Sequence, residues 1–133
     1  MDHAQLGAIT LFVADRQAAR DFYARLFAAE PIYQDATSAA FRLDNVILNL
    51  LMRDSADELI TPAPVAPAGS GSAFQLTLEV ADVDQTCREL VEDAIELLDG
   101  PMDRAWGVRT AAFADPDGHV WEVAAPIAAE EAS

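Results

Sequence analysis

The sequence predicts an α+β fold built from two tandem βαβββ modules. The segment LFVAD at 11–15 recurs as LEVAD at 78–82, 67 residues later. In each copy, a strand-like alternation leads into apolar residues spaced by three and four, which indicates an amphipathic helix. With 133 residues, the chain is long enough for one domain with a buried core. We therefore expect one domain over 1–133, with module one at 4–53 and module two at 73–126.

Module one begins with a strand that ends near Asp15. Asp15 is a good N-cap, because its carboxylate can accept the free amide hydrogens of a helix. Apolar residues continue at helical spacing as far as Phe27. Three strand-like segments follow, at Pro31–Asp35, Ser38–Leu43 and Val46–Met52.

The connector at 54–72 contains TPAPVAPAGSGS at 61–72, which has neither helical nor strand periodicity. Module two repeats the first arrangement, with Asp82 as the expected N-cap of its helix. Its predicted later strands are Ile95–Leu98, Val108–Ala114 and His119–Ala124. Neither module is expected to bury its sheet alone, so the two should pair in one domain.

Glu122 lies in the middle of an apolar strand, in FADPDGHVWEVA at 113–124. A tight turn is expected at Asp115-Pro116-Asp117-Gly118, and a carboxylate in such a strand needs a partner if it is buried. Strand alternation predicts which side chains share the face of Glu122 and which share the matching face of module one. Those residues are Ala8, Thr10, Phe12, Gln75, Thr77, Glu79, Val120 and Ala124.

The doubled module, AITLFVADRQAARDFYARLF near the start and FADPDGHVWEVA near the end resemble the vicinal oxygen chelate superfamily. This superfamily includes glyoxalase I, extradiol dioxygenases and bleomycin-resistance proteins. The resemblance implies a curled mixed sheet around a cavity, and a homodimer. It does not select one chemistry, because the fold hosts several.

The resemblance also implies four metal-ligand positions, which are occupied here by Ala8, Asn49, Gln75 and Glu122. Alanine has no donor atom, and one carboxylate with two amides is a poor set of ligands for a divalent cation. Leu48 would replace Asn49 if the register were displaced by one residue. The chain has two histidines, His3 near the N-terminus and His119 at the predicted turn. His119 is an odd number of residues from Glu122, so in a strand the two side chains would lie on opposite faces. We therefore expect no cofactor, and a divalent metal is disfavoured.

The segment GPMDRAWGVRT at 100–110 is expected to form a loop that carries Met102 and Trp106, followed by a strand opened by Arg109. Arg109 could pair with Glu122, with Glu79 or with a ligand carboxylate. The alternative is that Trp106 plugs the core and Arg109 forms a structural salt bridge. Both readings stay open from the sequence.

Composition narrows the class of partner. The net charge is −15, and eight basic residues without clustering disfavour nucleic acid and anionic membranes. A cationic small molecule would be attracted by such a charge. The start of the chain has no signal-peptide pattern, no apolar run could cross a bilayer, and the single Cys87 cannot form an internal disulfide. We therefore expect a cytoplasmic protein.

Three functions are compatible with these patterns, and the sequence does not decide whether the protein is an enzyme. The first is a metal-free protein that sequesters a small cationic or aromatic compound, with Phe12, Tyr33 and Trp106 available for stacking. The second is a glyoxalase- or dioxygenase-like enzyme that uses Glu122, with or without a metal. The third is a scaffold with a vestigial cavity. The predicted ligand-binding residues are Thr10, Phe12, Asn49, Gln75, Thr77, Met102, Trp106, Arg109 and Glu122.

Overall fold

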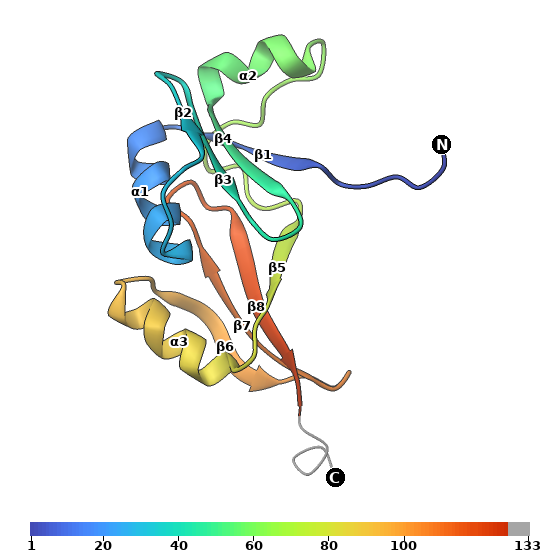
Figure 1. Cartoon of the computed structure of the whole chain (residues 1–133), viewed down its shortest axis with the longest axis vertical. Coiled ribbons are helices and arrows are strands. Elements are labelled where there is room, and N and C mark those ends of the chain that lie inside the picture. The colour runs from blue at the N-terminus through green and yellow to red at the C-terminus, as the bar shows by residue number, and fades with distance from the viewer. Residues whose placement is uncertain (128–133) are drawn as a thin grey trace. The chain divides into compact units, whose positions relative to one another are not determined.

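A computed structural model describes residues 1–127 and divides the chain into two compact units, 1–70 and 71–133. Unit 1 contains β1 (Ala8–Val13), α1 (Arg16–Phe27), β2 (Tyr33–Gln34), β3 (Ser38–Arg42), β4 (Ile47–Met52) and α2 (Arg53–Ile60). Unit 2 contains β5 (Gln75–Glu79), α3 (Val83–Glu92), β6 (Leu97–Asp103), β7 (Val108–Ala114) and β8 (Val120–Pro126) (Figure 1). The predicted βαβββ order is therefore confirmed in both units.

Unit 1 is a four-stranded mixed sheet in the order β1-β4-β3-β2, with β1 parallel to β4. The carboxylate of Asp15 accepts hydrogen bonds from the amides of Gln17 and Ala18, which starts α1 as predicted. Helix α1 covers one face of the sheet, and its buried Tyr23 ring lies 6.4 Å from that of Phe41. The other residues of this core include Leu11, Val13, Ala19, Phe22, Leu48 and Leu50.

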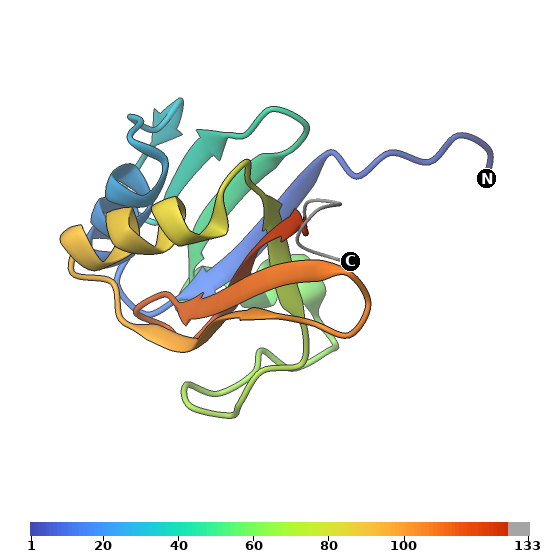
Figure 2. The ribbon, with the colours of Figure 1, turned by 90° about the horizontal axis from the view of Figure 1, so that it is seen from below.

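Unit 2 repeats the topology, with the strand order β5-β8-β7-β6 and β5 parallel to β8. Asp82 caps α3 through the amide of Gln85. The buried apolar residues of this unit come from the helix, the sheet and the segment between α3 and β6: Val83, Cys87, Leu90, Ile95, Ala111, Phe113, Trp121, Val123 and Ala125. In each unit, one face of the sheet is covered by a helix, as Figure 2 shows from below. We call the opposite face of each sheet its open face.

Two elements differ from the sequence prediction. Residues 54–60, assigned to the connector, belong to helix α2. Gly100–Asp103, predicted as loop, belong to β6, which extends over Leu97–Asp103 rather than 95–98. The pairing of β6 with β7 shifts register near Gly100 and Pro101, and such a bulge accommodates residues that a regular strand would exclude.

No helix in the described range, residues 1–127, is long and apolar enough to cross a membrane.

Candidate functional site

The face of the unit 1 sheet opposite α1 carries Thr10 and Asn49 side by side. They are register partners across the parallel pair β1 and β4, and the Asn49 amide donates to the Thr10 hydroxyl at 3.3 Å. Leu48 and Leu50, on either side of Asn49, are fully buried in the helix-covered core. The alternation of strand side chains therefore assigns Asn49, and not Leu48, to the face of Thr10.

The corresponding face of unit 2 carries Thr77 and Glu122. These residues are also register partners, and the Thr77 hydroxyl donates to a carboxylate oxygen (Oε1) of Glu122 at 3.1 Å. Gln75 precedes Thr77 on the same face and is exposed, whereas Trp121 and Val123 point into the core. The partner of Glu122 in this structure is thus a hydroxyl group, and Glu122 is half-buried.

The two pairs occupy equivalent places in the repeated fold. In each unit, the threonine is the third residue of the first strand, and its partner is the third residue of the last strand. The amide of Asn49 in one unit corresponds to the carboxylate of Glu122 in the other. The duplication predicted from LFVAD and LEVAD therefore extends to a polar pair on the open face of each sheet.

Arg109 lies on the opposite face of the unit 2 sheet from Glu122, which is a correction to one sequence reading. The pairing of β7 with β8 sets Ala112, not Arg109, beside Glu122. The Arg109 guanidinium contacts Asp84 and Asp103 at 3.0 Å each. Both hydrogen bonds raise the pKa of Arg109, and the bond with Asp84 has the larger effect. Neither Glu122 nor Glu79 is its partner, and the observed contacts match the alternative of a structural salt bridge.

Arg104 is a basic residue on the open face that the sequence analysis missed. Its Nε donates to the hydroxyl of the buried Thr110 at 2.8 Å, and its Nη2 donates to Asp99 at 2.8 Å. Thr110 shares the face of Ala112 and therefore of Glu122. The register of the β6–β7 hairpin is the feature that reveals Arg104. Because Met102 pairs with Thr110, the even-numbered residues near the hairpin turn lie on the face of Thr110.

Trp106 lies at the tip of the β6–β7 hairpin and is 71% exposed, so the reading of a core plug is wrong. The loop is Ala105-Trp106-Gly107, closed by a hydrogen bond from the amide of Arg104 to the carbonyl of Val108. Met102 is register partner of Thr110 and is 41% exposed. Tyr33, in unit 1, is also exposed, while Phe12 is half-buried on the face of Thr10.

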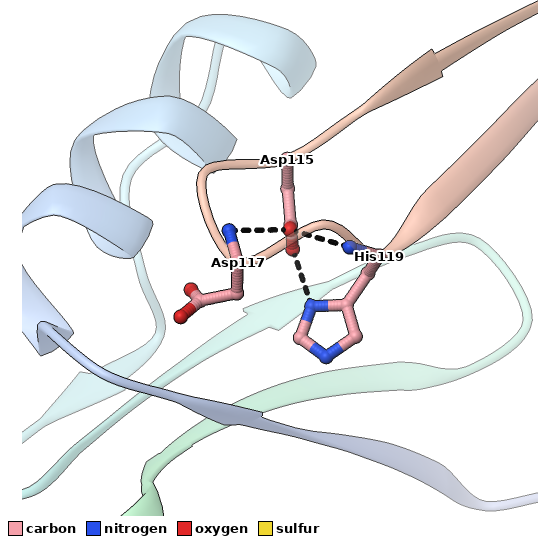
Figure 3. A group of neighbouring side chains, drawn as sticks. All are labelled: Asp115, Asp117 and His119. Atoms are coloured by element: carbon pink, nitrogen blue, oxygen red, sulfur yellow. Dashed lines mark hydrogen bonds and ion pairs between the residues drawn. The ribbon is translucent and has the colours of Figure 1, made fainter. Parts of the chain in front are cut away.

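The predicted turn at 115–118 is organised by the buried carboxylate of Asp115 (Figure 3). Asp115 accepts hydrogen bonds from the amides of Asp117 and His119, both at 2.9 Å, and its second oxygen lies 2.7 Å from Nδ1 of His119. Donor atoms of these three residues lie within 4.8 Å of one another, close enough for a metal. The contacts of Asp115 are those of a turn cap, so the cluster has a structural explanation.

The four positions that the resemblance assigns to a metal do not fit a divalent cation by their chemistry. Ala8 has no donor atom, and Asn49, whose NH2 group donates to Thr10, offers only a neutral amide oxygen. Gln75 and Glu122 provide one amide and one carboxylate, and the latter accepts from Thr77. A catalytic divalent cation normally has at least three good protein ligands.

Comparison with known proteins now gives the family. Residues 5–123 match the model of the glyoxalase/bleomycin resistance protein/dioxygenase superfamily, and the chain belongs to this superfamily. The fold is that of its solved members: a glyoxalase/bleomycin resistance protein/dioxygenase from Nocardioides is 23% identical, with a TM-score of 0.85, 100% of this chain and 90% of that chain being covered.

Two further solved structures come from proteins with different named roles. Lactoylglutathione lyase from Agrobacterium tumefaciens is 21% identical, with a TM-score of 0.72 over 92% of this chain and 93% of its own. TnmS3, an antibiotic-binding protein from Streptomyces sp. CB03234, is 26% identical, with a TM-score of 0.70 over 96% of this chain and 99% of its own. Solved proteins with this fold therefore include one named as a lyase and one named as an antibiotic-binding protein.

Proposed function

We propose that this chain is a small-molecule-binding protein that uses no metal, with Glu122 as its main polar contact. Its ligand would be a cationic or aromatic compound. The observation that carries the proposal is the pair of Thr77 and Glu122 on the open face of unit 2, where the hydroxyl of Thr77 engages one carboxylate oxygen. A half-buried carboxylate fixed in this way can accept a hydrogen bond from a cationic group of a ligand.

The neighbours of Glu122 support binding rather than solvation alone. Ala112 and Ala124 are small, which leaves room beside the carboxylate, and Met102 adds an adaptable apolar contact on the same face. The net charge of −15 would increase the encounter rate with a cation. The name of TnmS3 likewise states a binding role, that of an antibiotic-binding protein.

A thermal-shift screen of cationic and aromatic compounds tests the proposal, followed by calorimetry of the compounds that stabilise the protein. Glu122→Gln should weaken binding of a cationic compound by about tenfold or more, because a charge-assisted hydrogen bond contributes about 1.5–3 kcal/mol. Glu96→Gln is the matched control, since it makes the same charge change at an exposed position. If both variants bind like the wild type, Glu122 is not the contact.

The second candidate function is a metal-free enzyme with Glu122 as a general base, favoured by the position of Arg104 on the same face. A guanidinium near a reacting oxygen could stabilise developing negative charge. Formation or breakdown of lactoylglutathione, followed with and without Glu122→Gln, tests this alternative. Turnover that the variant abolishes would replace the binding proposal with the enzymatic one.

A further inference from the structure

The open face of unit 2 carries two groups of opposite charge that are held apart. One is the carboxylate of Glu122 on β8, which accepts from the hydroxyl of Thr77. The other is the guanidinium of Arg104, which directly follows β6 and donates through Nε to the hydroxyl of the buried Thr110 at 2.8 Å. No ion pair joins Arg104 to Glu122 within residues 1–127. Each charge is therefore positioned by a threonine of the sheet.

The register of β7 with β8 sets the separation of the two charges. Thr110 pairs with Ala124, which is two residues beyond Glu122 on β8. Glu122 and Thr110 are therefore diagonal neighbours, and such residues of an antiparallel pair lie about 7–8 Å apart between their Cα atoms. Because Nε of Arg104 contacts Thr110, the carboxylate and the guanidinium lie within the length of one small molecule.

The surface between the two charges is apolar and low. Ala112 pairs with Glu122, so Ala112 and Ala124 form the other diagonal of the same four-residue block, and both are half-buried. Met102 pairs with Thr110 and is 41% exposed, which extends the apolar surface to β6. A methyl group projects much less than a glutamate or arginine side chain. A flat apolar body can therefore lie over the alanines, with one end at each charge.

The guanidinium of Arg104 keeps one nitrogen for a ligand. Its Nε donates to Thr110 and its Nη2 to Asp99, but its Nη1 makes no hydrogen bond within residues 1–127. Nη1 is not a buried atom either, because the buried side-chain nitrogens without a partner in that range belong to Arg16 and Arg53. Nη1 of Arg104 therefore contacts solvent, and its N–H groups can donate to a ligand oxygen.

The contacts of Arg104 differ from those of an arginine with a purely structural role. On the other face of the same sheet, each guanidinium nitrogen of Arg109 donates to Asp84 or Asp103. The one ion-pair partner of Arg104 within residues 1–127 is Asp99, which is 55% exposed, so water screens this pair. A guanidinium that neighbours hold in place, but do not fully pair, is suited to bind a carboxylate.

We infer that Arg104 is a specificity-determining residue of the Glu122 site and that the ligand is a zwitterion. The cationic group of the ligand binds the carboxylate of Glu122. A carboxylate at its other end accepts from Nη1 of Arg104, and the apolar body between them lies over Ala112 and Ala124. This inference rests on the proposed function, to which it adds a second charged contact and the class of ligand.

Three compounds with the same aromatic ring test the inference by calorimetry at neutral pH and constant ionic strength. The zwitterion is para-(aminomethyl)benzoate, its methyl ester has only the cation, and para-toluate has only the carboxylate. The zwitterion should bind the wild type about tenfold or more tightly than the ester, because it adds a charge-assisted hydrogen bond. Arg104→Gln should remove this difference and leave the affinity for the ester unchanged.

Arg88→Gln is the matched control, since it makes the same charge change at an exposed position of α3, the helix on the other face. Asp99→Asn is a second test if Arg104→Gln does not fold. It should increase the advantage of the zwitterion over the ester severalfold, because it removes a carboxylate that competes for the guanidinium.

The outcomes separate this inference from the proposed function. An ester that binds as tightly as the zwitterion, or a difference that persists in Arg104→Gln, would overturn the inference and leave binding at Glu122 in place. An ester affinity that Glu122→Gln does not change would instead contradict the proposed function. No binding by any of the three compounds would overturn the inference as well.

Discussion

Gly100 occupies a position where a side chain has no room. Its φ is +85°, and a Cβ atom added to it would lie 2.5 Å from the carbonyl oxygen of Thr110. Gly107 has a similar φ of +90°, but nothing lies within 4 Å of the place its Cβ would take. The two glycines therefore separate the cost of an unusual backbone conformation from the cost of a steric clash.

Gly100→Ala should lower the free energy of unfolding by about 2–5 kcal/mol, through backbone strain of about 1–2 kcal/mol and an overpacking cost of about 1–3 kcal/mol. Gly107→Ala should cost only the backbone strain, about 1–2 kcal/mol. Urea unfolding of both variants measures the difference. Equal losses would mean that the backbone of β7 moves away from residue 100 at no cost.

Asp35 organises the turn between β2 and β3. The hydroxyl of Tyr33 donates to one carboxylate oxygen at 2.7 Å, and the amides of Thr37 and Ser38 donate to the other at 3.0 and 2.9 Å. These bonds, that from Tyr33 first, hold the pKa of Asp35 well below its usual range. The same contact raises the pKa of Tyr33.

The lowered pKa gives a pH dependence with a defined sign. A carboxylate whose pKa is lower in the folded state contributes stability that is present above its unfolded pKa, about 3.9, and is lost as pH falls through the folded value. The difference in melting temperature between the wild type and Asp35→Asn should therefore shrink between pH 5 and pH 2. A difference that stays constant over this range would contradict the role given to the ionised group.

Strand parity was enough to predict part of the candidate site at the level of single residues. Alternation correctly grouped Thr10 with Phe12 and Gln75 with Thr77, and the observed register then settled Asn49. Alternation does not predict the contacts of Arg109, because they depend on the register of the β6–β7 hairpin and of β7 with β8. A side chain's partner across a sheet depends on that register, which a single strand does not encode.

At the scale of elements, Arg109 connects α3 to the β6–β7 hairpin. Its guanidinium contacts Asp84 in the first turn of the helix and Asp103 at the end of β6. Both carboxylates are about half exposed, at 49% and 56%, so each ion pair is screened by water. The contacts fix the position of the helix relative to the hairpin without a large contribution to stability.

Arg109→Gln should produce a small decrease in the urea midpoint and no change in ligand affinity. Glu122→Gln should do the reverse, because Glu122 lies on the other face of the sheet. Unfolding and calorimetry of the two variants provide the comparison. A loss of ligand affinity in Arg109→Gln, with the fold intact, would show that the salt bridge is part of the binding site.

Helix α2 and the second part of β6 were not predicted from the sequence, because they lack the usual residues that mark where a helix or strand starts or stops. Helix α2 directly follows β4, and its N-cap, Met52, makes no side-chain capping bond. Strand β6 contains Gly100 and Pro101, which normally end strands and are accommodated here by a bulge. In contrast, α1 and α3 each follow a capping aspartate, and both helices begin where those residues predict.

At the scale of the whole chain, the repeated topology is the feature that the sequence predicts best. Two copies of one strand–helix signature led to two sheets with equivalent strand orders, β1-β4-β3-β2 and β5-β8-β7-β6. In each unit, the strand that comes first in the chain pairs with the strand that comes last, which joins residues 39 positions apart in unit 1 and 45 in unit 2. Periodicity within a segment says nothing about such partners.

The same resemblance leads us to propose a homodimer. Light scattering after size-exclusion chromatography should give a mass close to twice the chain mass of 14.3 kDa. The measured mass should stay the same when the protein is diluted severalfold. It should also stay the same at high salt, because salt screens the repulsion between two chains that each have a net charge of −15. A mass of one chain under all these conditions would contradict the dimer.

The most direct test of metal-free binding combines one ligand with one chelator. A compound found in the thermal-shift screen is titrated by calorimetry into protein purified without added metal, before and after treatment with EDTA. Plasma mass spectrometry reports the metal content of the same samples. We predict the same affinity in both titrations and no stoichiometric metal. Binding that disappears with EDTA, and returns with zinc, nickel, manganese or ferrous iron, would contradict this account.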